Sequence, residues 1–323
     1  MKKIFFLIII IFTLTGCNSY TELNNLSIVN TLGIDYQNNS YNLILSTIER
    51  SNDKDNINTY SANKKVLNEA INDIYLTSNK KLYLSHIDLL ILTPNTINNK
   101  LDEILDIFLK NNEYRNNFQV VIMNSNDIEN FFNKKVNSKE ITSLIDNNSK
   151  ETGIVYKKEL EEFLNDILID NNSYLPTITF NNDIITLSGY TLITNKKIDK
   201  ELSTDESIIL NLLNKKIKKA YISNISIYQS DIRIKTNKNK ISYELYLTTD
   251  TDDEAKIKEL KKTIEKFLKN YENTKYDILK LKELVRKNNY SYYKKHKDLS
   301  LEFNVKIINK IQSNYINGGF NEE

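Results

Sequence analysis

The side chains that carry most enzyme and metal chemistry are scarce in this chain. Its 323 residues include one cysteine, Cys17, and two histidines, His86 and His296. A nucleophilic serine or cysteine needs a base within hydrogen-bond reach, and no serine lies in a Gly-x-Ser-x-Gly turn. These residues are too few for the usual zinc ligand sets, and a lone cysteine cannot form an internal disulfide. The sequence therefore gives no indication of catalysis, and we expect no metal or other cofactor.

Cys17 is the residue whose surroundings indicate a specific modification. Lys2 and Lys3 precede an apolar run from Ile4 to Phe12, which is typical of a secretory signal. The run has about half of the ~20 residues that a membrane-spanning helix needs. The segment Leu14–Cys17 resembles a bacterial lipobox, in which the cysteine thiol receives a diacylglycerol and cleavage occurs just before it. We expect residues 1–16 to be a lipoprotein signal peptide; an uncleaved anchor and a buried strand are the alternatives.

The remaining candidates for chemistry have structural interpretations. His86 lies in an apolar stretch with Tyr83, so we expect a strand in which the His86 ring is largely buried and hydrogen-bonded. His296 falls in a lysine-rich run that is typical of a solvated loop. The adjacent Glu161 and Glu162 lie near the start of an expected helix, where acidic side chains favour the positive helix end.

Composition limits the classes of protein further. The chain has 44 Lys and Arg against 42 Asp and Glu, so its net charge of +2 gives no reason to expect a nucleic-acid partner. Its 40% hydrophobic content is typical of a folded chain. The six glycines do not have the spacing of a phosphate-binding or dinucleotide-binding loop. The length predicts about two domains, with three as the alternative.

Two kinds of apolar periodicity divide the chain into regions. Residues 17–182 alternate between helical and strand-like segments, with helices expected near 62–78, 101–108, from 126, and 160–167, and buried strands at 81–93 and 118–123. After residue 183, strand-like runs at 183–194, 221–235, 241–249 and 299–307 flank a helix from Ser203 and a long helical stretch over 251–288. This pattern predicts an α+β, multi-domain protein with mixed or antiparallel sheets packed against helices. Residues 17–182 form an N-terminal α/β region with room for two subdomains, and 183–323 a C-terminal α+β domain in which the long helix lies on an antiparallel sheet.

The residues after the lipobox resemble a known family. Glu22-Leu23, Leu26–Val29 and Leu32–Asp35 resemble the start of the C subunits of spore nutrient germinant receptors, the Ger(x)C lipoproteins. Leu82–His86 is similar to the family's Leu-Tyr-Leu-Ser-His segment. Weaker matches follow in order at Tyr114-Arg115, Leu187–Tyr190 and 275–279, whereas Asn18-Ser19 replaces the usual Trp-Asp.

The resemblance implies a three-domain, non-catalytic body tethered through Cys17 to the outer face of the spore inner membrane. It implies an A subunit and a membrane-embedded B subunit as partners, and a role in nutrient-triggered germination. Glu22, Leu23, Tyr83 and His86 are the candidate structural or partner positions. A solute-binding lipoprotein of a transporter is the alternative, although such proteins usually hold ligands at glycine-bearing loops of doubly wound lobes. An exported hydrolase comes third, because it lacks a nucleophile beside a base.

The lipid anchor can be tested directly by Cys17→Ala. The wild-type chain should mature to an N-terminal Cys17 that carries lipid, whereas the variant should be uncleaved or released, because no other cysteine supplies a thiol. Intact-mass analysis checks this, with the folded 18–323 body as the control. A mature N-terminus elsewhere, without a lipid adduct, would contradict the assignment.

Overall fold

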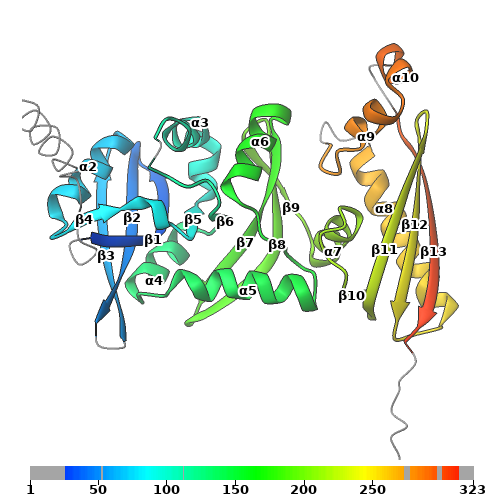
Figure 1. The fold of residues 1–323 in the computed structure, drawn as a ribbon, viewed down its shortest axis with the longest axis horizontal. Helices are drawn as coiled ribbons and strands as arrows, with labels where there is room; N and C mark the ends of the chain where they lie inside the picture. The colour runs from blue at the N-terminus through cyan, green and yellow to red at the C-terminus, as the bar shows by residue number, and fades with distance from the viewer. Residues whose placement is uncertain (1–25, 52–53, 112, 273–276, 297–299, 313–323) are drawn as a thin grey trace, which may run out of the picture.

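The computed structural model describes residues 26–51, 54–111, 113–272, 277–296 and 300–312. Within them, two sheets and their covering helices follow one another along an elongated body, with α2 at one end and β13 at the other (Figure 1). The first part of the chain contains β1 (Leu26–Gln37), β2 (Ser40–Ser51), β3 (Lys54–Lys64), α2 (Leu67–Thr77), β4 (Lys81–Tyr83), the 3-10 helix η2 (Leu84–His86), β5 (Leu89–Leu92), α3 (Pro94–Lys110), β6 (Gln119–Ile122), α4 (Ser125–Asn133), α5 (Ser138–Glu151) and α6 (Leu160–Asp170).

The remaining elements complete the first sheet and build the second. They are β7 (Asn172–Asn181), β8 (Ile184–Thr194), β9 (Lys197–Glu201), α7 (Thr204–Leu213), β10 (Ala220–Ile222), β11 (Ile225–Asn237), β12 (Lys240–Thr249), α8 (Glu254–Glu272), α9 (Leu281–Asn288), α10 (Tyr290–Lys295) and β13 (Glu302–Ile311). The α+β class with mixed sheets is therefore confirmed.

The first sheet, sheet A, has nine strands in the order β3-β2-β1-β5-β6-β7-β8-β9, with β4 paired to β1. Its hairpins are antiparallel, whereas β1, β5, β6 and β7 run parallel to one another. The pairing between β6 and β7 consists of the single register pair Ile122↔Thr177, so the sheet is narrowest there.

Strands β5 and β6 are buried on both faces of sheet A. In β5, Leu90 and Leu92 pack toward the side covered by α2, α3 and α6, whereas Leu89 and Ile91 pack toward α4 and α5. Such continuous apolar runs are typical of parallel strands with helices on both faces. The buried strand expected at 118–123 is confirmed as β6, whereas the one expected over 81–93 is divided into β4, η2 and β5.

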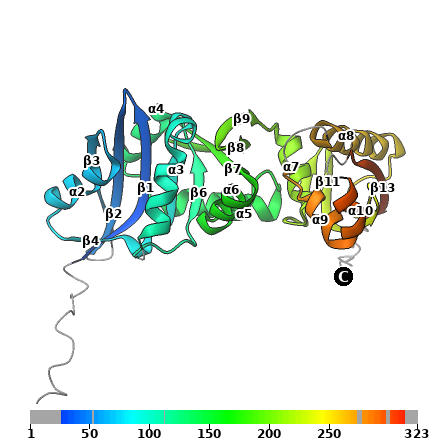
Figure 2. The same ribbon diagram turned by 90° about the horizontal axis from the view of Figure 1, so that it is seen from above.

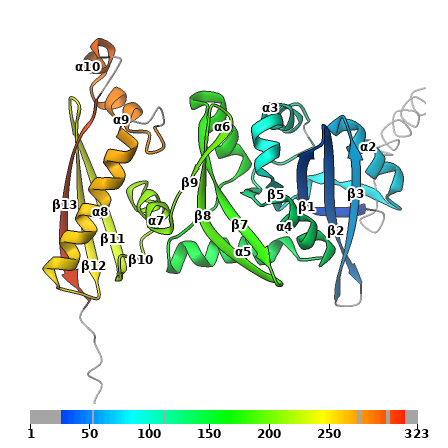
Figure 3. The same ribbon diagram turned by 180° about the vertical axis from the view of Figure 1, so that it is seen from behind.

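The second sheet, sheet B, has the order β10-β11-β12-β13 and carries α8 along one face, as the two opposite views in Figures 1 and 3 show. Leu260, Ile264 and Phe267 of α8 are buried in one cluster with Val305 of β13, so the expected packing of helix on strand is confirmed. The sheet is not purely antiparallel, however, because β13 pairs parallel to β12. After β12 ends, the chain passes through α8, α9 and α10 and returns to the end of the sheet where β12 began, so β13 runs in the same direction as β12.

The expected domain boundary between residues 182 and 183 divides two paired strands. β7 and β8 form an antiparallel hairpin whose turn is Asn182-Asp183, and both belong to sheet A. The alternating pattern that begins at 183 therefore marks the second strand of a hairpin within sheet A and not the start of a new sheet. Sheet A continues to β9, and the path to sheet B runs through α7.

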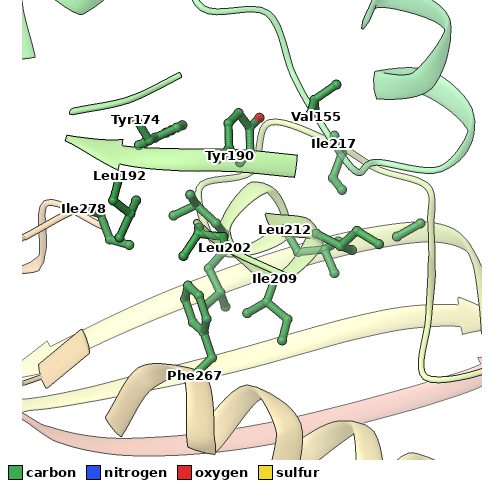
Figure 4. Packing of buried hydrophobic residues seen from close by; sticks show 14 of the residues in the cluster. Val155, Tyr174, Tyr190, Leu192, Leu202, Ile209, Leu212, Ile217, Phe267 and Ile278 are labelled. Atoms are coloured by element: carbon green, nitrogen blue, oxygen red, sulfur yellow. The ribbon is translucent and has the colours of Figure 1, made fainter. Parts of the chain in front are cut away.

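Helix α7 joins the two sheets and is buried on all sides. Every residue from Ser207 to Leu213 is buried, which is typical of a helix enclosed within a core. Figure 4 shows its side chains Ile209 and Leu212 between Tyr190 of sheet A and Phe267 of α8. The helix begins with the expected capping box, in which Ser203 and Glu206 bond to each other's backbone N–H groups.

Leu210→Ala should test how much α7 contributes to the fold. Leu210 is fully buried, so removing its side chain should lower the free energy of unfolding by about 2–5 kcal/mol. The control Leu168→Ala, on the exposed side of α6, should change it by less than about 0.5 kcal/mol. Chemical denaturation of both variants gives the comparison, and equal stabilities would contradict a packed role for α7.

Candidate functional site

A polar pocket of about 210 Å³ lies beside α6, where β7, the end of α7 and the segment before α9 meet. Most of its lining is charged or amide-bearing: Lys158, Glu162, Asp166, Asp170, Asn172, Ser173, Tyr174, Asn214, Lys216, Asp277, Ile278 and Lys280. Residues from sheet A and from the C-terminal helices thus share one site. We refer to it as the α6 pocket.

A buried ion pair forms the inner wall of the α6 pocket. The Lys158 side chain is only 2% exposed, and its ammonium lies 2.5 Å from Asp166 and 3.1 Å from Glu162. The same ammonium lies 4.6 Å from the centre of the Tyr174 ring, within range of a cation–π interaction. A charge this deeply buried is tolerated only with such partners.

Asp166 connects this wall to the C-terminal part of the chain. One carboxylate oxygen, Oδ1, accepts a hydrogen bond from Lys280 at 2.9 Å, whereas the Ser173 hydroxyl donates at 3.0 Å to Oδ2, the oxygen that also faces Lys158. Burial disfavours the charged form of Asp166, but the ammonium groups of Lys158 and Lys280 outweigh that effect and lower its pKa. Asp166 therefore stays ionised and pairs with cations from both sides.

At the rim of the α6 pocket, the charged side chains are also paired with groups of the protein. Lys216, which follows α7, lies 3.4 Å from Glu162 and 5.3 Å from the centre of the Tyr156 ring. The Asp277 carboxylate accepts hydrogen bonds from the backbone N–H groups of Leu281 and Lys282 at the start of α9. Burial raises the pKa of Asp277, against the effect of these N–H donors.

This arrangement is suited to holding parts of the chain together. Each lysine in the α6 pocket lies against a carboxylate or an aromatic ring, and neither histidine of the chain lines it. Over the described ranges, no cluster of His, Cys, Asp and Glu is placed to hold a metal ion. What the geometry does provide is a set of ionic contacts from α6 to the segments that follow α7 and α8.

The sequence-based expectation for His86 is wrong. His86 is exposed and belongs to η2, not to a strand. Its ring lies 5.3 Å from that of Tyr83, a half-buried residue of β4. The chain turns at η2 between the two short strands, so the apolar neighbours Leu84 and Ile87 are buried while His86 points to solvent.

Other residues of the family-like motifs have structural roles in the described chain. Asp35 is buried and accepts a hydrogen bond from the Thr93 hydroxyl at 2.7 Å, and Thr93 in turn caps α3 by accepting from the N–H of Thr96. Gly33 packs against Phe132, whose Cε2 would lie 2.5 Å from an added Cβ. Cys17, Glu22 and Leu23 lie outside the described residues.

The α6 pocket was not found by sequence reasoning. The sequence pattern places Glu162 near the start of a helix and includes Lys158 and Asp166 in no motif. Charged residues eight positions apart are common, and only the fold buries these two. The one local signal is the i, i+4 spacing of Glu162 and Asp166, which places these two carboxylates on one side of α6, whereas Lys158 comes from the segment before the helix.

The chain combines an α+β fold with an N-terminal segment that is typical of a membrane-anchored lipoprotein. Residues 1–18 match the prokaryotic membrane lipoprotein lipid attachment site, and no helix in the described ranges is long and apolar enough to cross a membrane. Residues 19–180 match the spore germination protein N-terminal domain. The chain therefore belongs to the Ger(x)C family of spore germination proteins.

Two individual proteins are similar to this chain. Spore germination protein KC of Bacillus subtilis (strain 168) is 24% identical over 222 residues, which cover 62% of this chain and 52% of that protein. The chain thus spans about half the length of this curated relative. The crystal structure of the GerBC protein matches at a TM-score of 0.49 with 15% identity, over 90% of this chain and 99% of that one.

Asp166→Asn should lower the free energy of unfolding and make that free energy less sensitive to acidic pH. The variant leaves the buried Lys158 ammonium without its closest anion, so unfolding should become easier by about 3 kcal/mol at neutral pH. A lowered carboxyl pKa stabilises the fold above the unfolded-state pKa of about 3.9, and this stabilisation is lost as pH falls through the folded-state pKa. The variant should therefore lose less stability than the wild type below about pH 4.

The matched control is Asp102→Asn, which removes an exposed pair with Lys196. Its effect should stay within about 0.5 kcal/mol. Urea titrations of the three proteins at neutral and acidic pH give the comparison. If Asp166→Asn behaves like Asp102→Asn at both pH values, the ion cluster does not hold the fold together.

Proposed function

We propose that this chain is a lipid-anchored, non-catalytic subunit of a spore nutrient germinant receptor, required for nutrient-triggered germination. The observation that carries the proposal is the match of residues 19–180 to the spore germination domain, directly after a lipid attachment site over residues 1–18. In this proposal Cys17 holds the chain at the outer face of the spore inner membrane. An A subunit and a membrane-embedded B subunit are its partners.

The contacts in the described residues support a mechanical role over a catalytic one. The ionic groups of the α6 pocket neutralise one another, so they are better placed to hold the body in one arrangement than to transform a substrate. In this proposal, a germinant bound elsewhere in the receptor acts on this subunit through contacts that differ between two receptor states, as any population shift requires. Tyr83 and the exposed His86, together with Glu22 and Leu23, are the proposed partner positions.

Loss of this chain should abolish germination in response to the nutrients of its receptor, while a non-nutrient trigger should still work. Spores that lack the gene, and spores complemented with wild type, Cys17→Ala or Leu168→Ala, can be compared by loss of optical density. Wild type and the exposed-site control Leu168→Ala should restore the response, whereas Cys17→Ala should restore it poorly because the anchor is absent. An unchanged nutrient response without the gene, for every nutrient tested, would contradict the proposal.

A ligand screen separates this proposal from a solute-binding role. A receptor subunit that signals through protein contacts should show no shift in melting temperature with single amino acids or sugars. A concentration-dependent rise would instead follow from a ligand that binds only the folded chain, and would favour the transporter lipoprotein.

A further inference from the structure

The last turn of α2 presents apolar side chains to solvent. Leu76 is 85% exposed, more than any other large apolar side chain that the structure describes, and its neighbour Tyr75 is 37% exposed. Leu67, Ala70 and Ile74 of this helix are buried and Ile71 is partly buried, so the helix does not need Leu76 for its own packing. Single exposed apolar residues are common on protein surfaces, but exposed apolar side chains that adjoin an apolar groove can mark a site for a protein or a membrane.

A groove extends from this turn across the space between α2 and α3. Its volume is about 670 Å³, and its apolar lining comes from Ile71, Tyr75, Leu84, Ile107 and Tyr114. The rest of its lining is polar and comes from Asn68, Asn72, Lys110, Asn111 and Glu113. Tyr75 thus belongs both to the groove and to the exposed turn.

Basic residues follow the turn directly. Lys81 is exposed at the start of β4, and Lys80 lies 3.3 Å from Glu49. Of the two acids on the same helix, Asp73 is paired with Lys64 at 3.2 Å, and the exposed Glu69 lies in the first turn, away from the turn that carries Leu76. An apolar side chain and a tyrosine next to an exposed lysine match the composition of surfaces that sit in the headgroup layer of a membrane.

The tether enters the body at the same place. β1 begins at Leu26, whose register partner is Lys81, the fourth residue after the end of α2. Cys17 precedes Leu26 by nine residues, so even a fully extended chain keeps the lipid within about 30 Å of this point. Figure 2 shows β4 and α2 at one end of the body and sheet B at the other.

We propose that the last turn of α2 and Lys81 rest in the headgroup layer of the bilayer that holds the lipid on Cys17. The occupant of this surface is the membrane itself, so the body stands with its N-terminal end on the bilayer and sheet B directed away from it. This inference rests on the lipid attachment that forms part of the proposed function.

The absence of tryptophan from the sequence allows a direct test, because Leu76→Trp introduces a single indole. The full lipidated chain is purified and placed in vesicles of equimolar phosphatidylglycerol and phosphatidylethanolamine. The indole emission of Leu76→Trp should shift to shorter wavelength on vesicle binding and be quenched by brominated lipid. The control Ile169→Trp, which replaces a 76% exposed residue of α6, should keep a water-like emission in the same vesicles.

Each other outcome has a distinct meaning. Water-like emission from both variants, in chains that do float with the vesicles, overturns the docking of α2 and leaves the lipid anchor intact. A shift that appears only after membrane-embedded receptor subunits are added also overturns it, because the occupant is then a protein. Chains that do not float with the vesicles overturn the anchor and this inference together.

Discussion

The packing of α7 between the two sheets is the constraint on which the rest of the structure depends. Sheet A and sheet B each expose an apolar face toward this helix, and its residues from Ser207 to Leu213 are buried among them. A fully enclosed helix leaves no room for unpaired polar groups. Accordingly, the Ser207 hydroxyl accepts from the N–H of Tyr190, and Asn211 accepts from the Tyr190 hydroxyl at 2.8 Å while donating to the carbonyl of Gly153. Apolar contact and hydrogen bonding thus fix the same helix to sheet A.

Two further features follow from this constraint. Gly189 has a φ of +105°, and a Cβ there would lie 2.6 Å from the Ser207 hydroxyl, so a larger residue would push α7 away from β8. The ion cluster around Asp166 adds a second link between the same parts, because Lys280 reaches it from the segment between α8 and α9. In the proposed receptor, a body linked twice in this way would carry a displacement at one end toward the other, since packed cores switch between discrete arrangements and do not deform freely.

Local patterns predicted most individual elements, but contacts between distant residues decided how they pair. The helical spacing of Leu101 to Phe108 and the capping box at Ser203 were correct because nearby residues determine them. The packing of α8 on β13 was also correct, because each element has an apolar face that needs cover. The parallel pairing of β13 was missed because an alternating strand fits either direction. The expected domain boundary fell inside the β7–β8 hairpin because the alternation of β8 is also what a strand of a new sheet would show. The expectation that His86 is buried in a strand was wrong, because its apolar neighbours give no sign of the turn that η2 forms there. The α6 pocket lies beyond such reasoning, since Lys158 and Lys280 meet at Asp166 only in the folded chain.

A tethered receptor subunit of the kind proposed acts through its contacts with other subunits. The most direct test isolates the tagged, full-length chain from detergent-solubilised spore membranes and identifies the proteins that elute with it by mass spectrometry. We expect two further receptor subunits, one of them embedded in the membrane, to elute with the chain in a fixed ratio. Elution of the chain alone, or with the membrane components of a solute transporter, would contradict this expectation.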